Sequence, residues 1–169
     1  SYYVDSALDV VTEAVDAGID RVNAYVSDTL DANVEDLYLY DAATGGTGNV
    51  LNNLIHGNST DNVLFGLGAN DSLFGYDGND TLNGGAGADT IFDNAAGNSV
   101  ISGGTGDDRI VLYDNSHTTF TLGSGNDTID GGAGFDTAII SWEYNTTSAM
   151  TVTLSGDILT ASSAAGMTV

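Results

Sequence analysis

Aspartates are the residues of this sequence that offer the most chemistry. The chain has 24 acidic residues against two Lys and Arg, for a formal net charge of −22, and only Glu13, Glu35 and Glu143 among the acids are Glu. Glu favours helices, whereas Asp competes with the helical backbone and favours turns, caps and cation-binding loops. A charge of this size opposes compaction unless something offsets it, and divalent cations are the obvious candidate. With no Cys, the chain offers neither disulfides nor thiolate metal sites.

The same composition excludes several classes of protein. Two cationic side chains cannot neutralise a run of phosphates, so we expect no nucleic-acid partner. The negative charge repels an anionic membrane surface, and no apolar run approaches the roughly 18 residues that span a bilayer, so we expect no membrane insertion. His56 and His117 are the only histidines, and the chain has no His-Glu-x-x-His, no Gly-x-Ser-x-Gly and no Lys. We therefore expect no catalytic residues and a protein that is not an enzyme.

The elements that must position the aspartates are visible as a repeat in the middle of the chain. An apolar residue recurs every nine or ten positions, at Ile55, Leu64, Leu73, Leu82, Ile91, Ile101, Ile110, Phe120, Ile129 and Ala138. Each apolar residue follows a hexad rich in Gly and Asn, which accept positive φ and form tight turns. The three residues centred on the apolar one form a short strand whose middle side chain points inward. Two units make one coil, and stacked coils give two parallel sheets with an apolar ladder between them.

The clearest units lie at residues 75–83, 84–92 and 103–111, with 122–130 and 131–139 nearly as good. They resemble the repeats-in-toxin (RTX) family of haemolysin-type proteins, whose calcium-binding nonapeptide reads Gly-Gly-x-Gly-x-Asp-x-U-x with U apolar. This resemblance spans residues 48–139 and implies an all-β, right-handed parallel β-roll, or β-solenoid. It also implies that each Ca²⁺ lies between successive loops on one side, held by the hexad-final Asp and early-loop carbonyls of units two repeats apart. Such all-oxygen ligation suits a hard cation.

Because successive units alternate between sides, the hexad-final residues form two stacks. One stack reads Asn53, Asp71, Asp89, Asp108 and Asp127, and the other reads Asn62, Asp80, Ser99, Thr118 and Asp136. The consecutive aspartates of the first stack predict about three complete calcium sites, whereas Asp80 and Asp136 predict at most weak ones. The loop residues expected to contribute to the sites are Gly84, Gly85, Ala86, Gly87, Gly103, Gly104, Thr105 and Gly106.

Two ten-residue steps interrupt the period, at about Asp93 and Leu112. Both lie just ahead of loops that lack the Asp, those of Ser99 and Thr118, which indicates that a loop without metal is free of the length constraint. Two interpretations of the neighbouring acids Asp93 and Asp114 remain open. Either they build an irregular site, or they are solvated loop residues.

The flanks have a different composition, since 20 of the 23 Gly lie between Gly45 and Gly134. Residues 1–47 predict a β-rich flank or an extension of the solenoid, although Leu8, Val11, Val15, Ile19 and Val22 also fit one helical face. Residues 48–139 form the roll, and residues 140–169 predict a β-rich cap over its open end. The sequence at both ends reads as that of a fragment.

The residues after the inward ladder point outward, and on one sheet they include Phe74, Phe92 and Val111. This apolar stripe predicts either a surface for self-association or a neighbouring module, or a face covered by the chain's own terminal segment. The leading hypothesis is a calcium-dependent structural or adhesive module of a secreted bacterial RTX protein, such as an adhesin, surface layer or matrix fibre. The alternative is the non-catalytic roll of a type I-secreted protease, lipase or polysaccharide-modifying enzyme. The resemblance implies type I export and folding on calcium outside the cell or at its surface.

Overall fold

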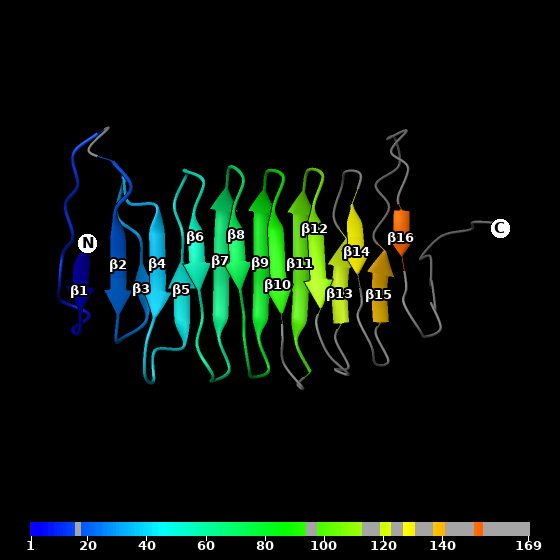
Figure 1. The fold of residues 1–169 in the computed structure, drawn as a ribbon, viewed down its shortest axis with the longest axis horizontal. Helices are drawn as coiled ribbons and strands as arrows, with labels where there is room; N and C mark the ends of the chain where they lie inside the picture. Colours follow the sequence, from blue (N-terminus) through cyan, green and yellow to red (C-terminus); the bar gives the residue numbers. More distant parts are fainter. Residues whose placement is uncertain are drawn as a thin grey trace, which may run out of the picture.

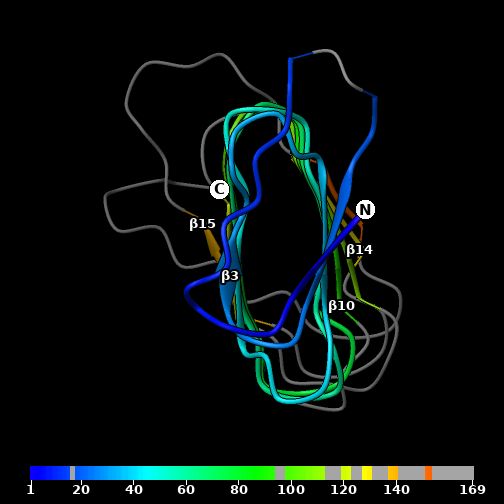
Figure 2. The same ribbon diagram turned by 90° about the vertical axis from the view of Figure 1, so that its left-hand side faces the viewer.

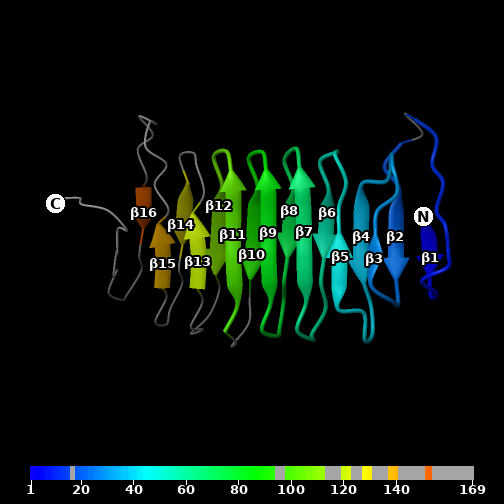
Figure 3. The same cartoon turned by 180° about the vertical axis from the view of Figure 1, so that it is seen from behind.

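The chain folds into two parallel sheets that face each other along one axis (Figure 1). A computed structural model describes residues 1–15, 18–93, 98–112, 119–122, 127–130, 137–140 and 151–153. Seen along the axis, successive turns superimpose as one flattened coil (Figure 2). The view from behind brings to the front the sheet that contains β7, β9 and β11 (Figure 3). The predicted all-β parallel roll is confirmed.

We call the nine-stranded sheet "sheet A" and the seven-stranded sheet "sheet B". Sheet A consists, in spatial order, of β1 (Tyr2–Val4), β2 (Arg21–Ala24), β4 (Asp36–Leu39), β6 (Leu54–His56), β8 (Ser72–Phe74), β10 (Thr90–Asp93), β12 (Arg109–Leu112), β14 (Thr128–Asp130) and β16 (Thr151–Thr153). Sheet B consists of β15 (Thr137–Ile140), β13 (Thr119–Leu122), β11 (Val100–Thr105), β9 (Thr81–Ala86), β7 (Val63–Gly68), β5 (Gly45–Thr47) and β3 (Asp28–Thr29). The chain alternates between the sheets from β2 onward, which is how a coil with one strand on each side is built.

An apolar ladder fills the space between the sheets. The register pairs Ile55 with Leu73 and Leu73 with Ile91, so equivalent side chains lie directly above one another. Burying one Leu or Ile side chain contributes about 1.5–3 kcal/mol. The largest fully buried side chains are Val22, Leu37, Ile55, Leu64, Leu73, Leu82, Ile91, Ile101, Ile110 and Ile129. The structure therefore shows the predicted inward series and extends it to Val22 and Leu37, while the side chains of Phe120 and Ala138 lie outside the described part.

The N-terminal segment adds strands to both sheets. Strands β1, β2 and β4 continue sheet A, and β3 and β5 continue sheet B, ahead of the first nonapeptide. The competing helical face is wrong, because residues 5–15 and 18–20 contain no helix and Leu8, Val15 and Ile19 are exposed. Among the described residues there is no helix long and apolar enough to cross a membrane. At the other end β16 pairs with β14, and the rest of the expected C-terminal cap lies outside the described residues.

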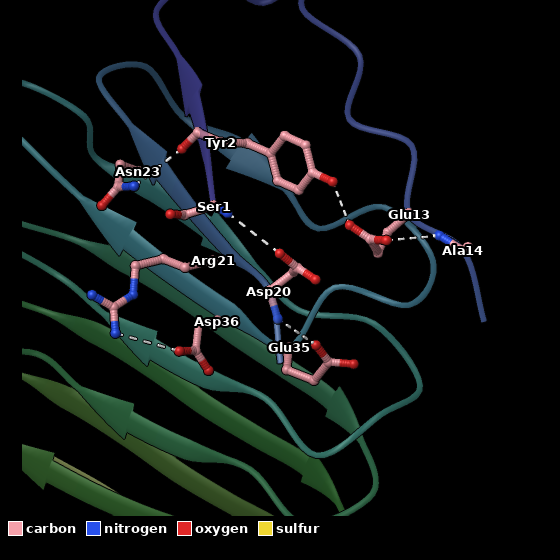
Figure 4. A network of polar contacts seen from close by, with 9 residues as sticks. All are labelled: Ser1, Tyr2, Glu13, Ala14, Asp20, Arg21, Asn23, Glu35 and Asp36. Atoms are coloured by element: carbon pink, nitrogen blue, oxygen red, sulfur yellow. Dashed lines mark hydrogen bonds and ion pairs between the residues drawn. The ribbon is translucent and has the colours of Figure 1, made fainter. Parts of the chain in front are cut away.

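Polar side chains tie the first strands together (Figure 4). The hydroxyl of Tyr2 donates a hydrogen bond to Glu13, and Asn23 Nδ2 donates to the carbonyl of Tyr2 over 3.1 Å. Arg21 forms an ion pair with Asp36 at 3.6 Å between strands β2 and β4. These contacts join segments that the nonapeptide pattern does not cover.

Candidate metal sites

Four aspartates stack at one edge of the roll, each directly before a strand of sheet A. Asp71, Asp89, Asp108 and Asp127 are at most 4% exposed. Each accepts at Oδ1 the backbone N–H of the stack residue one coil earlier, over 2.7, 2.8, 2.9 and 3.0 Å, starting from Asn53. The structure thus brings together the members of the first predicted stack, which we call the first carboxylate ladder.

The second oxygen of three of these carboxylates is buried without a hydrogen-bond donor. The atoms are Oδ2 of Asp71, Asp89 and Asp108. Burial raises the pKa of Asp71 and of Asp108 to about 7, although a backbone N–H on each carboxylate acts in the opposite direction. Burial likewise raises the pKa of Asp89 and of Asp127. A carboxylate removed from water needs either a proton or a cation, and these atoms are placed to receive one.

The first glycine of each repeat makes room for that oxygen. A Cβ at Gly66 would lie 2.3 Å from Asp71 Oδ2 and 2.5 Å from the carbonyl oxygen of Gly84. A Cβ at Gly84 would similarly lie 2.3 Å from Asp89 Oδ2 and 2.6 Å from the carbonyl oxygen of Gly103. A carboxylate oxygen and a carbonyl oxygen of the next coil therefore meet beside each glycine, which is a donor set that suits calcium.

The second and fourth residues of the repeat are Gly for a different reason. Gly85 and Gly104 have φ of 110° and 112°, and Gly87 and Gly106 have φ of 137° and 122°. A Cβ at Gly104 would lie only 1.9 Å from the carbonyl oxygen of Gly85. Positive φ and close backbone approach between coils thus account for these positions.

The carbonyl oxygens of the predicted loop residues have different surroundings. Those of Gly84 and Gly103 lie beside the first glycine of the preceding coil, as the carboxylate oxygens do. The carbonyl of Thr105 instead accepts the N–H of Gly87 over 2.8 Å, and Ala86 pairs with Thr105 between β9 and β11. No three Asp, Glu or His side chains converge on one point within the described residues. Because Ca²⁺ takes six to eight oxygen ligands, carbonyl oxygens have to complete any coordination sphere here.

The second predicted stack differs from the first. Asp80 accepts the N–H of Asn62 at Oδ1 over 2.8 Å and donates its own N–H to Ser99 Oγ over 3.1 Å. Its Oδ2 is buried without a hydrogen-bond partner, and burial raises its pKa to about 7. Thr118 and Asp136, the remaining members of this stack, lie outside the described residues.

Asparagines end both stacks on the N-terminal side. Asn53 Nδ2 donates to the carbonyl of Glu35 over 3.2 Å, and Asn62 Nδ2 donates to that of Ala43 over 3.3 Å. In these two turns the side-chain amide therefore satisfies a backbone carbonyl by a hydrogen bond, and no metal ion is needed for it. Asn58, which the sequence prediction did not include, adds a 2.7 Å bond to the same Ala43 carbonyl. Asn58 follows Asn49 by nine residues, which is one repeat, and this spacing is the sequence signal that could have identified it.

The family model of the RTX calcium-binding nonapeptide repeat matches four copies in this chain, over residues 56–91, 95–114 and 119–138. The repeats are RTX repeats. The match includes the loops of Asp71, Asp80, Asp89 and Asp108, so the cation implied by the resemblance, Ca²⁺, is confirmed as that of the repeat. Comparison with curated proteins and with solved structures finds no match. The chain thus contains a calcium-binding RTX β-roll.

Proposed function

We propose that this RTX chain is a structural module that folds on calcium outside the cell, within a bacterial adhesin, surface layer or matrix fibre exported by type I secretion. The observation that supports this most is the first carboxylate ladder, whose buried Oδ2 atoms lack hydrogen-bond donors in a chain of net charge −22. Calcium between the coils satisfies these oxygens and cross-links successive turns. Its binding free energy then becomes folding free energy.

The affinity we expect fits a chain that stays unfolded until it leaves the cell. Calcium-binding modules of extracellular proteins have dissociation constants of about 10⁻⁴–10⁻³ M, far weaker than those of cytosolic sensors. At lower calcium concentrations the acidic residues repel one another and the buried carboxylates oppose folding. The chain is then unfolded where calcium is scarce and folded where calcium is plentiful.

The outer face of sheet A carries a row of stacked aromatic rings. The rings of Tyr38, His56, Phe74 and Phe92 stack in register, with centroids 4.1, 4.5 and 4.7 Å apart. Burial, and secondarily Arg21, lowers the pKa of His56, which favours the neutral imidazole within the stack. We call these four rings the aromatic stripe. Each is half-buried, so the stripe presents ring edges to solvent.

The chain's two cationic side chains flank this stripe. Arg21 lies over the ring of Tyr38 at 4.0 Å, and Arg109 lies 5.9 Å from that of Phe92. In a protein of charge −22 this is a surface where a second copy of the module can approach with less repulsion. We therefore propose self-association through the aromatic stripe. Val111, predicted to extend the exposed stripe, is only 4% exposed and is corrected to a buried position.

Calcium titration followed by far-ultraviolet circular dichroism tests the proposed function. Metal-free protein should give the spectrum of an unfolded chain, and calcium should restore the β-sheet spectrum with a midpoint of about 10⁻⁴–10⁻³ M. Magnesium at the same concentration is the control, since it demands a smaller octahedral site and should not substitute. A β-sheet spectrum that persists after chelation would contradict the proposal.

A further inference from the structure

A different pair of carboxylates lies at the opposite edge of the roll from the first carboxylate ladder. Asp93 ends strand β10, at the first ten-residue step of the repeat. Phe92 is the register partner of Phe74, so Asp93 lies over Gly75 and occupies the position that the first glycine holds in other repeats. Asp93 is 2% exposed, and it is therefore not a solvated loop acid.

Asp93 and Asp80 direct oxygens to the same point. A Cβ at Gly75 would lie 2.5 Å from Asp80 Oδ2 and 2.8 Å from Asp93 Oδ1. Burial, and after it the charge of the nearby Asp93, raises the pKa of Asp80 to about 7. Asp80 is 1% exposed, and its Oδ2 has no hydrogen-bond donor. Two buried carboxylates in contact cannot both stay ionised unless a positive charge lies between them.

The local sequence shows why an acidic side chain fits where other repeats need glycine. At Gly66 and Gly84 the hexad-final Asp of the same loop fills the space that a Cβ would take. In the loop after Asp93 the hexad-final residue is Ser99, whose shorter side chain bonds to the N–H of Asp80 instead. The carboxylate lost at Ser99 is replaced by one at Asp93.

The neighbouring coils restrict this arrangement to a single site. On one side Asn62 stands at the position equivalent to Asp80, and its amide bonds to a backbone carbonyl. On the other side Leu112 is the register partner of Asp93 and is 3% exposed, so it supplies no ligand. Among the residues that the structure describes the pair is therefore isolated, unlike the continuous first carboxylate ladder.

We propose that Asp80 and Asp93 together hold one Ca²⁺ between the coils, at a site that the nonapeptide motif does not encode. The two carboxylates neutralise the ion and backbone carbonyls complete its oxygen shell. This inference rests on the calcium-dependent folding proposed above. It follows the first of the two interpretations of Asp93 given above, with Asp80 in place of Asp114 as the other ligand.

The test is a count of bound calcium per chain by equilibrium dialysis, with isothermal titration calorimetry for affinity, on the calcium-folded protein. Asp93→Asn should bind one ion fewer than the wild type and still fold on calcium. Asp80→Asn/Asp93→Asn should lose the same single ion, because both residues serve one site. Asp77→Asn, which removes an exposed charge from the loop that holds Asp80, should leave the count unchanged.

A wild-type count retained by Asp93→Asn would overturn the site and point to a shared proton between the carboxyls. If Asp93→Asn fails to fold, Asp93→Gly/Ser99→Asp moves the carboxylate back to its motif position. Recovery of folding and of the full count would then support the site, and failure to recover would overturn it. A wild-type chain that binds no calcium overturns the proposed function as well, so the two failures are distinguishable.

Discussion

Replacing Gly84 with Ala tests how closely Asp89 Oδ2 and the carbonyl oxygen of Gly103 approach the repeat's first glycine. The backbone of Gly84 is one that Ala adopts, so the effect comes from the added Cβ alone. That Cβ would lie 2.3 Å from Asp89 Oδ2, whereas carbon atoms in contact sit about 3.5–4.0 Å apart, so neighbours must move by roughly 1 Å. Overpacking of this kind costs about 1–3 kcal/mol. The variant should fold on calcium less readily than the wild type.

The expected shift of the calcium midpoint depends on how many ions bind together. A cost of about 2 kcal/mol is roughly thirtyfold in the overall binding constant, or roughly threefold in the calcium midpoint when three ions bind together. If Asp89 instead leaves its position, its two neighbouring sites lose a ligand and the shift is larger. Circular dichroism during calcium titration measures the midpoint. Gly68→Ala is the matched control, because its Cβ would meet nothing closer than 3.9 Å and its midpoint should stay at the wild-type value. Equal midpoints for the two variants would refute the positions assigned to Asp89 Oδ2 and to the carbonyl oxygen of Gly103.

Three further perturbations test other parts of the structure. Asp108→Ala, which removes a ligand shared by two ions of the first carboxylate ladder, should raise the calcium midpoint more than Asp80→Ala, and equal shifts in titrations would show that the two stacks are equivalent. Because burial raises the pKa of Asp108 to about 7, its folded form holds the proton more tightly than the unfolded chain does, and the resulting stability is present below about pH 4 and lost as the pH rises through 7. Calcium-depleted protein should therefore gain β-sheet signal in circular dichroism between pH 8 and pH 5, and a signal independent of pH would argue against buried, uncompensated carboxylates. Phe74→Ser/Phe92→Ser should weaken self-association in sedimentation analysis while folding on calcium survives, since each stacked pair contributes only about 0.5–1.5 kcal/mol. A double variant that no longer folds would place these rings in the internal packing of the roll.

The nine-residue period is enough to predict the two sheets, because one residue in each unit must point inward and a slip in register would expose it. Ile55, Leu73 and Ile91 therefore pair as the spacing requires. The period also sorts Asp71 and Asp80 to opposite edges, since a coil holds two units.

The same period could not predict where side chains go after an insertion. Asp93 takes a glycine position at the ten-residue step and is buried there, while Ser99 in the next turn bonds to the N–H of Asp80. Val111 is assigned to the correct face, as its pairing with Phe92 shows, but a pattern gives the face and not the atoms that pack on it. The contact of Arg21 with the ring of Tyr38 could not be predicted from the period either, because it joins a flank outside the repeat to the aromatic stripe.

The first stack begins with an asparagine, Asn53, and continues with aspartates, so its two ends differ in chemistry. At Asn53 the amide supplies both an acceptor, for the N–H of Asn49 over 2.7 Å, and a donor, for the carbonyl of Glu35 over 3.2 Å. From Asp71 onward the carboxylate supplies acceptors only, and the donor that Asn provides has to be replaced by a cation. An amide has no charge to desolvate, so Asn53 avoids the burial cost that Asp71, Asp89 and Asp108 carry. Calcium therefore offsets a burial cost that begins at Asp71 and recurs at each later aspartate of the stack.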